Sequence, residues 1–188
     1  MIATDASREQ IAQAQPHARV EYRVEPAESS TLGAHSADLI TVAQAAHWLD
    51  LDAFYKEARR VGRPNAVIAL VAYHIAVINP PVDTVIAGFY GGTLEGYWPP
   101  DRKHIESGYR DLAFPFERIP SPQMDMRVRW KVDQMLGYIR TWSAVRAFEK
   151  AKGPALTDRF AAELREVWGK GALDVRWPIV IVAGRLGD

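Results

Sequence analysis

The first residue that could do chemistry is Asp5, which stands between a strand-like start and a helix-like segment in MIATDASREQI. A carboxylate at the carboxyl end of a strand in a doubly wound sheet often accepts hydrogen bonds from ribose hydroxyls. Spacing alone favours a simpler role, in which Asp5 caps the N-terminus of the following helix. Ser7 is another N-cap candidate, with Gln10 as its capping-box partner, and Pro16 is predicted to end that helix.

The five histidines lack the spacing of a metal site, and the chain has no cysteine to supply a thiolate or a disulfide. We therefore predict no metal site and expect most of these histidines to lie on the surface or in a hydrogen-bonded core. They are His17, His35, His47, His74 and His104. The glycines at 88, 91, 92 and 96 match neither a P-loop nor a dinucleotide-binding motif and indicate a flexible lid or loop. Without a GxSxG motif, hydrolase chemistry has little support.

The composition predicts a soluble, cytoplasmic protein. The chain has 188 residues, of which 48% are hydrophobic, enough for one sizeable core. Its 23 basic side chains balance its 23 acidic ones, so neither nucleic acid nor a membrane surface is an expected partner. The longest apolar run, residues 66–78, is shorter than the ~20 residues that a membrane-spanning helix needs. No secretory signal is visible, and the lack of cysteine fits a reducing cytoplasm.

The first part of the chain alternates between strand and helix periodicity. Apolar and polar residues alternate over residues 20–25, as in a half-buried strand. Residues 36–44 resemble a short apolar strand, and residues 51–62 an amphipathic helix that ends at Gly62. Residues 65–73 have the apolar character of a parallel strand covered on both faces. This order predicts a doubly wound α/β fold.

The rest of the chain is predicted to form a mostly helical cap and then to return to the sheet. Residues 79–122 are rich in proline, glycine and aromatic residues, which favours short helices broken at Pro99 and Pro100. Residues 124–130 alternate like a strand, and residues 131–150 and 155–171 have the apolar spacing of helices. Pro178 lies in the final β-rich run and suggests an edge strand or a bulge. We predict a single domain, with a sheet core in residues 1–78 and 170–188 and a helical cap in residues 79–169.

Several blocks of the sequence together form a recognisable pattern. An acid at Asp5 ends a strand, an Ala-Glu pair follows at Ala27 and Glu28, and residues 38–48 form a D-L-[IV]-T-x-x-x-A-x-H-W segment. Further blocks are YKEARRVGRPNAVIAL, YW-P-x-R, FPF, GYIRTWSA and WPIVIVAGR. These blocks resemble class I S-adenosylmethionine-dependent methyltransferases, in particular the small-molecule branch that includes trans-aconitate methyltransferase, in which the acid ends the second strand and the Ala-Glu pair follows the third. The resemblance covers essentially the whole chain and implies a Rossmann-like methyltransferase sheet.

The resemblance implies roles for individual residues toward the cofactor S-adenosylmethionine. Asp5 would bind its ribose, and Ala6 would touch its adenine. Ala27 and Glu28 would line the adenine pocket. Gln44 would lie near the methionine part or the methyl group.

The resemblance also implies a site for a small-molecule methyl acceptor. His47 and Trp48 would lie beside the acceptor. The aromatic residues Tyr90, Tyr97 and Trp98 would form a wall or a lid, because aromatic faces attract a sulfonium cation. For each of these rings, packing of the cap onto the sheet is at least as good an explanation.

Two acceptor chemistries stay open. An oxygen acceptor of high pKa requires a base, and His47 is the candidate catalytic residue. A carboxylate acceptor requires no base, and Arg102 or Arg140 would bind its charge. For His47, a structural hydrogen bond within its loop is an equal alternative.

The family begins with a strand and a glycine-rich turn that hold the methionine end of the cofactor, and no such segment precedes Asp5. We therefore expect an N-terminally truncated sheet with unpaired apolar edges, and weak or absent cofactor binding by this chain alone. Three readings stay open. They are a methyltransferase whose edges pair in a homodimer, a non-catalytic remnant or interaction subunit that completes its sheet with a partner, and a Met1 that is internal to a longer enzyme.

Overall fold

The computed structural model describes residues 1–187, which form two compact units. The first unit consists of residues 1–72, residues 109–122 and the C-terminal residues from Ile181. The second unit consists of residues 73–108 and 123–180. Both units are therefore assembled from separate stretches of chain.

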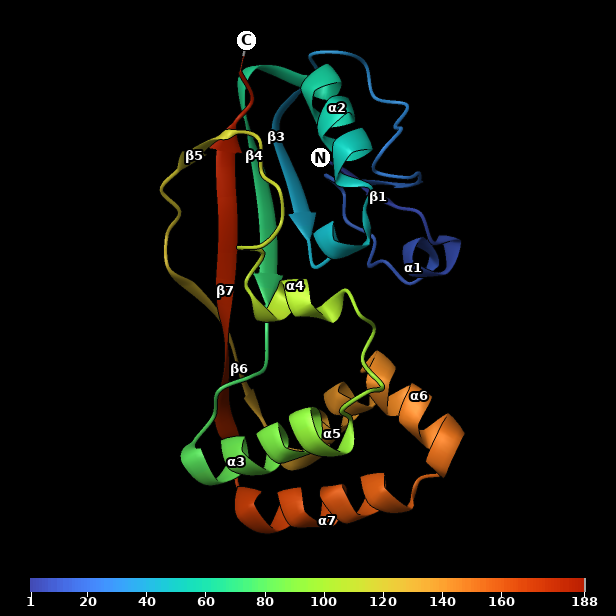
Figure 1. Ribbon diagram of the computed structural model, residues 1–188, viewed down its shortest axis with the longest axis vertical. Coiled ribbons are helices and arrows are strands. Elements are labelled where there is room, and N and C mark those ends of the chain that lie inside the picture. Colours follow the sequence, from blue (N-terminus) through green and yellow to red (C-terminus); the bar gives the residue numbers. More distant parts are fainter. Residues whose placement is uncertain (188) are drawn as a thin grey trace. The chain divides into compact units, whose positions relative to one another are not determined.

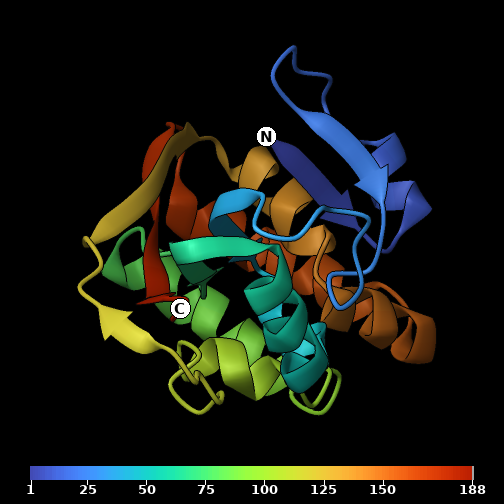
Figure 2. The ribbon, with the colours of Figure 1, turned by 90° about the horizontal axis from the view of Figure 1, so that it is seen from above.

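The first unit contains two pairs of parallel strands (Figure 1). β1 (Ile2–Asp5) pairs with β2 (Glu21–Val24), and β3 (Ala37–Ala43) pairs with β4 (Gly62–Tyr73). Figure 2 shows β1 and β2 as neighbouring arrows, and among the described residues these two strands form a sheet of their own. The predicted α/β alternation with parallel strands is confirmed.

α1 (Arg8–Ala12) is shorter than predicted, and its cap differs from the predicted capping box. The Ser7 hydroxyl accepts the Gln10 N–H at 3.2 Å, as an N-cap does. The Ser7 N–H, however, donates to Asp5 Oδ1 at 2.7 Å rather than to the Gln10 side chain. Asp5 therefore takes the role predicted for Gln10, because an aspartate carboxylate readily accepts the backbone N–H of the residue two positions later. Asp5 is not itself the N-cap.

α2 (Leu51–Val61) follows the prediction and connects directly to β4. Its N-cap is Asp50, whose carboxylate accepts the Ala53 N–H at 3.1 Å. The helix buries an apolar stripe with helical spacing, formed by Phe54, Tyr55, Ala58 and Val61. Gly62 ends the helix with extended backbone (φ −67°, ψ 141°), and a Cβ at this position would collide with Leu186.

β7 (Leu173–Arg185) lies inside the sheet, so the edge position predicted from Pro178 is wrong. The strand order is β3-β4-β7-β5, with β5 at Glu117–Ile119, and β6 (Met124–Trp130) also pairs with β7. Pro178 lies opposite Asp125, and the antiparallel register of β6 and β7 continues through it without a bulge. A proline is compatible with such a ladder where its nitrogen faces away from the partner strand.

The second unit is mostly helical, as predicted for the middle of the chain. Its strand β6 occupies the residues predicted to form a strand. Its helical elements are α3 (Pro80–Gly88), the π-helical turn η2 (Phe89–Thr93), α4 (Arg102–Glu106), α5 (Val132–Arg140), α6 (Ser143–Lys152) and α7 (Ala155–Trp168).

The single helix predicted over residues 131–150 is wrong, because α5 and α6 are separated at Thr141 and Trp142. The Thr141 hydroxyl donates to the Tyr138 carbonyl at 2.6 Å, which satisfies one of the last free carbonyls of α5. Trp142 has extended backbone (φ −63°, ψ 134°), and its ring packs against Tyr90 and Trp98 at centroid distances of 5.7 and 5.6 Å. Tertiary packing of this indole therefore accompanies a break that helix periodicity does not reveal.

One hydrophobic core holds the second unit together. α3 and α7 lie side by side (Figure 1), and Phe89 stacks on Phe160 with ring centroids 3.8 Å apart. Leu94, Met135 and Leu164 are fully buried in the same cluster. Burying large side chains of this kind stabilises a fold by roughly 1.5–3 kcal/mol each.

Within residues 1–187, no helix has the length and apolar character that crossing a membrane requires.

Candidate functional site

Three strands of the first unit carry candidate site residues beyond their carboxyl ends. Asp5 ends β1, Ala27 and Glu28 follow β2, and Gln44 follows β3. Because β1 and β2 are parallel, with Asp5 opposite Val24, the chain leaves both strands at the same edge. Ligands of open α/β sheets bind outside the carboxyl ends of the strands. These residues therefore lie where a cofactor site is expected.

Asp5 has one engaged and one available carboxylate oxygen. Its Oδ1 accepts the Ser7 N–H at 2.7 Å, and its Oδ2 has no hydrogen-bond partner among residues 1–187. The side chain is exposed, as is Ala6 in the bend that follows. An oriented carboxylate with a free oxygen fits the predicted role of Asp5 as a ribose ligand.

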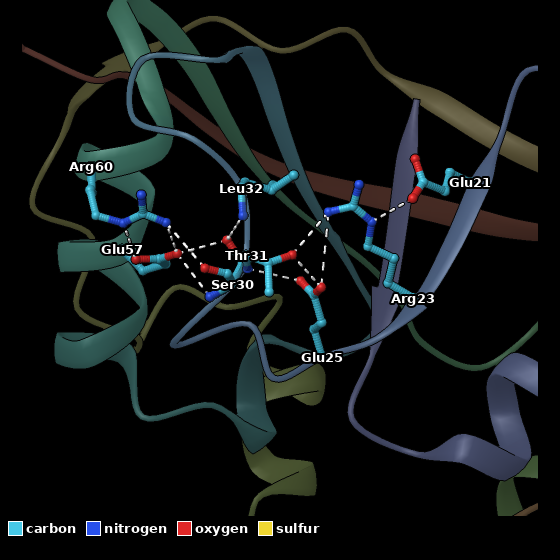
Figure 3. Close-up of polar contacts among 8 residues, drawn as sticks. All are labelled: Glu21, Arg23, Glu25, Ser30, Thr31, Leu32, Glu57 and Arg60. Carbon is cyan, nitrogen blue, oxygen red and sulfur yellow. Dashed lines mark hydrogen bonds and ion pairs between the residues drawn. The ribbon is translucent and has the colours of Figure 1, made fainter.

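The loop after β2, whose sequence includes Ala27 and Glu28, is anchored by hydrogen bonds of Glu25 and of Ser30 (Figure 3). On one side, Glu25 accepts the Thr31 hydroxyl at 2.6 Å and the Thr31 N–H at 3.1 Å. On the other side, Ser30 donates its hydroxyl and its N–H to Glu57 of α2 at 2.7 and 2.9 Å. These contacts fix the path of the segment that carries the predicted adenine-lining residues.

Glu57 is held as a carboxylate by its hydrogen bonds. Arg60 donates its Nε–H and an Nη2–H to the two oxygens of Glu57, at 2.7 and 2.6 Å (Figure 3). These bonds, and those from Ser30, lower the pKa of Glu57 from 4.5 to about 2, against the opposing effect of burial. The anchor of the loop is therefore charged at neutral pH.

Glu28 contacts the start of α2. Its Oε1 accepts the N–H of Asp50, the N-cap residue, at 3.2 Å. This contact satisfies a backbone donor at the helix N-terminus, where a carboxylate is also favoured by the helix dipole. Glu28 thus has a structural partner, and its adenine-lining role stays a prediction, as does that of Ala27.

Gln44 adopts a backbone conformation that is unusual for a residue with a Cβ. Its φ is +54°, and its N–H donates to the Val71 carbonyl at 2.8 Å, so the chain turns sharply at the end of β3. Left-handed backbone costs an L-residue roughly 1 kcal/mol or more and is enriched at functional sites. The geometry is consistent with the role predicted for Gln44 near the methionine part.

His47 belongs to the short 3-10 helix η1 (Ala46–Trp48) and contacts a buried tyrosine. Its Nδ1 lies 3.0 Å from the Tyr109 hydroxyl, and its ring lies 4.6 Å from that of Trp48. The Trp48 side chain is 58% exposed. The structural hydrogen bond considered for His47 is thus present, although to Tyr109 rather than within its own loop.

In the second unit, three polar side chains meet at the Tyr90 hydroxyl. It donates to Glu106 Oε1 at 2.8 Å, and Arg102 donates its Nε–H to it at 2.9 Å. The His74 Nε2 lies 3.2 Å from the same oxygen. Burial raises the pKa of Tyr90 to about 12, so the phenol keeps its proton at neutral pH.

Arg102 is oriented by rings as well as by this hydrogen bond. Its guanidinium carbon lies 4.8 Å from the centre of the Trp98 ring and 5.5 Å from that of Tyr90. The Trp98 indole N–H donates to the Tyr90 carbonyl at 3.0 Å, which fixes the two rings relative to each other. The terminal nitrogens of Arg102 have no hydrogen-bond partner among residues 1–187. A cation with fixed orientation and free N–H groups is suited to bind an anion.

Of the four residues predicted for the acceptor in this unit, Tyr90, Trp98 and Arg102 are brought together, whereas Tyr97 is not. The Tyr97 ring packs edge-on against Phe148, with centroids 5.1 Å apart, at the border of the hydrophobic core. Core packing therefore accounts for Tyr97.

The sequence prediction missed His74 and Glu106 as members of the Tyr90 cluster and Tyr109 as the partner of His47. For His74 a signal exists, because it directly follows β4 and thus stands at the carboxyl end of a buried parallel strand. Glu106 and Tyr109 lie in a segment without periodicity, where no local pattern identifies their contacts. Among residues 1–187, no group of three or more histidine or acidic side chains could hold a metal ion.

Comparison with known proteins agrees with this architecture. Residues 1–70 match a family described as a methyltransferase domain. A candidate methyltransferase of Dictyostelium discoideum is 31% identical over 193 aligned residues, covering 98% of this chain and 73% of its own. A solved structure, described as a candidate type II methyltransferase from Anaeromyxobacter dehalogenans, is 46% identical and superposes with a TM-score of 0.91, covering 99% of this chain and 80% of its own.

The chain thus belongs to the class I S-adenosylmethionine-dependent methyltransferases. It is a methyltransferase enzyme with a Rossmann-like fold, and its cofactor is S-adenosylmethionine. A methyl acceptor is therefore its second substrate.

Proposed function

We propose that this enzyme methylates a small molecule that presents a carboxylate. The resemblance of the HW and YIRTWSA blocks to the branch that includes trans-aconitate methyltransferase supports an acid as acceptor. The observation that carries the proposal is Arg102, whose guanidinium is fixed by Tyr90 and Trp98 while its terminal nitrogens have no partner among the described residues. Arg140, the other candidate anchor, is exposed at the end of α5. We therefore assign the carboxylate to Arg102.

The first unit would hold the cofactor through residues at the strand ends. The free Oδ2 of Asp5 would accept hydrogen bonds from the ribose hydroxyls. Ala6 and Ala27, whose side chains are small, would contact the adenine ring, and Glu28 would line the same pocket. The sharp turn at Gln44 would bring backbone close to the methionine part. When bound, S-adenosylmethionine supplies a methyl group that is bonded to its sulfonium sulfur.

The proposed reaction requires positioning more than acid–base chemistry. A carboxylate oxygen forms a bond to the methyl carbon while the carbon–sulfur bond breaks, and its electron pair stays on sulfur. The products are a methyl ester and S-adenosylhomocysteine. Because a carboxylate has no proton to lose, the step needs no base. The contribution of the chain is to orient the acceptor through Arg102, with Tyr90 and Trp98 as aromatic neighbours.

A carboxylate acceptor changes what is expected of His47. Its Nδ1 is within hydrogen-bond distance of the Tyr109 hydroxyl, and an asparagine amide can keep this contact. His47→Asn should therefore retain kcat for an acid within a few-fold. If the acceptor were a hydroxyl that needs a base, the same substitution would lower kcat about 10²–10⁴-fold.

The test is transfer of tritiated methyl from S-adenosylmethionine to succinate, citrate and trans-aconitate, with the matching amides as neutral controls. We expect base-labile ester products from the acids and none from the amides. Arg102→Met should raise KM for the acid about tenfold or more, since a charge-assisted hydrogen bond is worth about 1.5–3 kcal/mol. Arg129→Met removes an exposed arginine of β6 and should change nothing. Methylation of a hydroxyl or an amine, or equal loss in Arg102→Met and Arg140→Met, would contradict the assignment.

The weak cofactor binding expected for these 188 residues stays a prediction. Isothermal titration of S-adenosylhomocysteine into the chain measures it directly. Tight binding with one cofactor per chain would contradict it.

We also propose that the exposed strands of the first unit pair in a homodimer. β3 ends its sheet, and along β3 only Val42 is buried, whereas Leu39 is 58% exposed. Ile2 of β1 and Val24 of β2 are also exposed. Strands that have one unpaired edge and exposed apolar side chains favour pairing with another chain.

A further inference from the structure

We propose that His74, Tyr90 and Glu106 are positioning residues that hold Arg102 for the acceptor carboxylate, and that His74 does so as a hydrogen-bond donor through Nε2. This inference rests on the proposed function and extends it to His74 and Glu106, which the resemblance does not include. His74 and Glu106 come from different elements, the end of β4 and the helix α4.

The proton on His74 follows from the hydrogen-bonding capacity of one oxygen. A tyrosine hydroxyl has one proton to donate and two lone pairs that accept. The exposed carboxylate of Glu106 can only accept, so it takes the Tyr90 proton at 2.8 Å. The Arg102 Nε–H can only donate, and it fills one lone pair at 2.9 Å. At 3.2 Å, the His74 Nε2 must therefore donate to the second lone pair.

The geometry links the orientation of Arg102 to the histidine. With all three bonds made, the Tyr90 hydroxyl hydrogen is directed to Glu106 and a lone pair is left for Arg102. If His74 presented a bare Nε2, histidine and carboxylate would compete for the single phenol proton. Either the His74 nitrogen or the Glu106 carboxylate would then face the Tyr90 oxygen with no proton between them, and the lone pairs of the two atoms would repel each other. The donor form of His74 is the one that satisfies every member of the cluster.

The charge on His74 also bears on anion binding. Burial lowers the pKa of His74, the neighbouring Arg102 lowers it further, and Glu106 opposes both effects. The titratable and charged groups that face the ring are Tyr90 from η2 and these two residues of α4. An anion bound at Arg102 would favour the charged imidazole, so anion binding and protonation of His74 should strengthen each other.

The tautomer can be observed directly. In ¹⁵N-edited NMR spectra of the histidine rings, His74→Gln identifies the His74 signals by their loss. We expect a proton on Nε2 and a bare Nδ1 at pH 7.5. A neutral His74 protonated on Nδ1 would overturn the proposal.

The positioning role is tested by binding of succinate, followed through the tryptophan fluorescence to which Trp98 and Trp142 contribute. Tyr90→Phe keeps the ring but removes the shared oxygen, and should weaken succinate binding about tenfold. His74→Ala should weaken it, whereas His74→Gln retains an N–H donor and should bind within about twofold of the unmodified protein at pH 8. His17→Gln, at an exposed turn of the first unit, serves as the matched control and should bind unchanged. Equal binding by His74→Ala and the unmodified protein would overturn the role of His74.

A pH series separates positioning from mere structural support. The ratio of the succinate Kd of His74→Gln to that of the unmodified protein should rise as pH falls from about 8 to about 6. If succinate raises the pKa of His74 by about half a unit, the rise approaches about threefold only at pH values well below that pKa. Because both proteins meet the same succinate, ionisation of the acid cancels in the ratio. A ratio that stays constant would contradict the coupling.

The binding experiment does not depend on methyl transfer. If succinate binds as expected but no acid is methylated, the proposed acceptor fails and the cluster stands as an anion site. If acids are methylated but Tyr90→Phe and His74→Ala leave their KM unchanged, the proposed function stands and this inference fails.

Discussion

Glu57 and Tyr90 show how hydrogen bonds decide whether burial determines the pKa of a titratable side chain. For Glu57, hydrogen bonds from Arg60 and Ser30 outweigh burial, and the pKa falls to about 2. For Tyr90, burial outweighs the nearby guanidinium, and the pKa rises to about 12. One group therefore stays charged and the other stays neutral at any pH near neutrality. These protonation states match the hydrogen bonds of the two side chains. The Glu57 carboxylate accepts from Ser30, and the Tyr90 phenol donates its proton to Glu106.

The depressed pKa of Glu57 predicts an acid-sensitive contribution to stability. An unfolded glutamate titrates near 4.5 and the folded one near 2. The stabilisation is therefore complete above about pH 5 and is lost as pH falls toward 2. We expect Glu57→Gln to lower the free energy of unfolding at pH 7 and to approach the unmodified protein at pH 3. Urea unfolding followed by circular dichroism measures this difference, with Glu166→Gln, an exposed residue of α7, as control. A gap that is independent of pH would contradict the prediction.

At the scale of the elements, close backbone approach decides where a glycine is required. A Cβ at Gly184 of β7 would lie 2.8 Å from the carbonyl oxygen of Glu117, the first residue of β5, and 2.9 Å from the Cβ of Phe116, the residue before it. Real Cβ contacts are not this short, and backbone cannot move aside as a flexible side chain can. Gly137 of α5, in contrast, has nothing within 4 Å of such a Cβ.

Replacing each of these two glycines by alanine should change the melting temperature in opposite directions. Gly184→Ala should lower the melting temperature, because overpacking of a core typically costs about 1–3 kcal/mol. Gly137→Ala should raise it, because alanine is favoured over glycine inside a helix by about 1 kcal/mol. Thermal unfolding by differential scanning calorimetry measures both changes. A Gly184→Ala protein as stable as the unmodified one would show that β5 is not packed as described.

How much of the fold could be predicted from sequence depended on whether the decisive contact was local. The strands at residues 36–44 and 65–73 and the helix at 51–62 have their own periodicity, and each was found. The break at Trp142 is accompanied by packing of its indole against Tyr90 and Trp98, which are remote in sequence. The position of β7 inside the sheet likewise depends on strands that only the tertiary structure identifies.

The same distinction applies to the site. The resemblance supplied Tyr90, Trp98 and Arg102, and the structure brings these three together. It did not supply His74, which reaches Tyr90 across 16 positions of sequence. The capping contact of Asp5 was missed for a local reason, because two different side chains could reach the Ser7 N–H and spacing does not decide between them.

At the scale of the whole molecule, the exposed strands lead to a prediction about assembly. If β3 pairs with a second copy, a lysine in place of Leu39 would place a charge where an apolar side chain is covered. We expect the unmodified protein to elute as a dimer in size-exclusion chromatography with light scattering, and Leu39→Lys to elute as a monomer. Thr41→Lys replaces an exposed polar residue of the same strand and tests whether a charge on β3 is by itself enough to prevent the dimer. A monomeric unmodified protein would contradict the homodimer.

The passage of β7 through both units has a consequence for biosynthesis. The first unit includes the residues from Ile181, and there the Leu186 N–H donates to the Ala66 carbonyl at 2.8 Å, across 120 positions of chain. During synthesis β3 and β4 leave the ribosome before β7, the strand that lies between β4 and β5 in the sheet. Distant pairings of this kind slow folding and leave strands uncovered in the meantime. The sheet of the nascent chain therefore stays incomplete until β7 is made, and so does the core of the second unit, because its buried residues Val175 and Trp177 belong to β7.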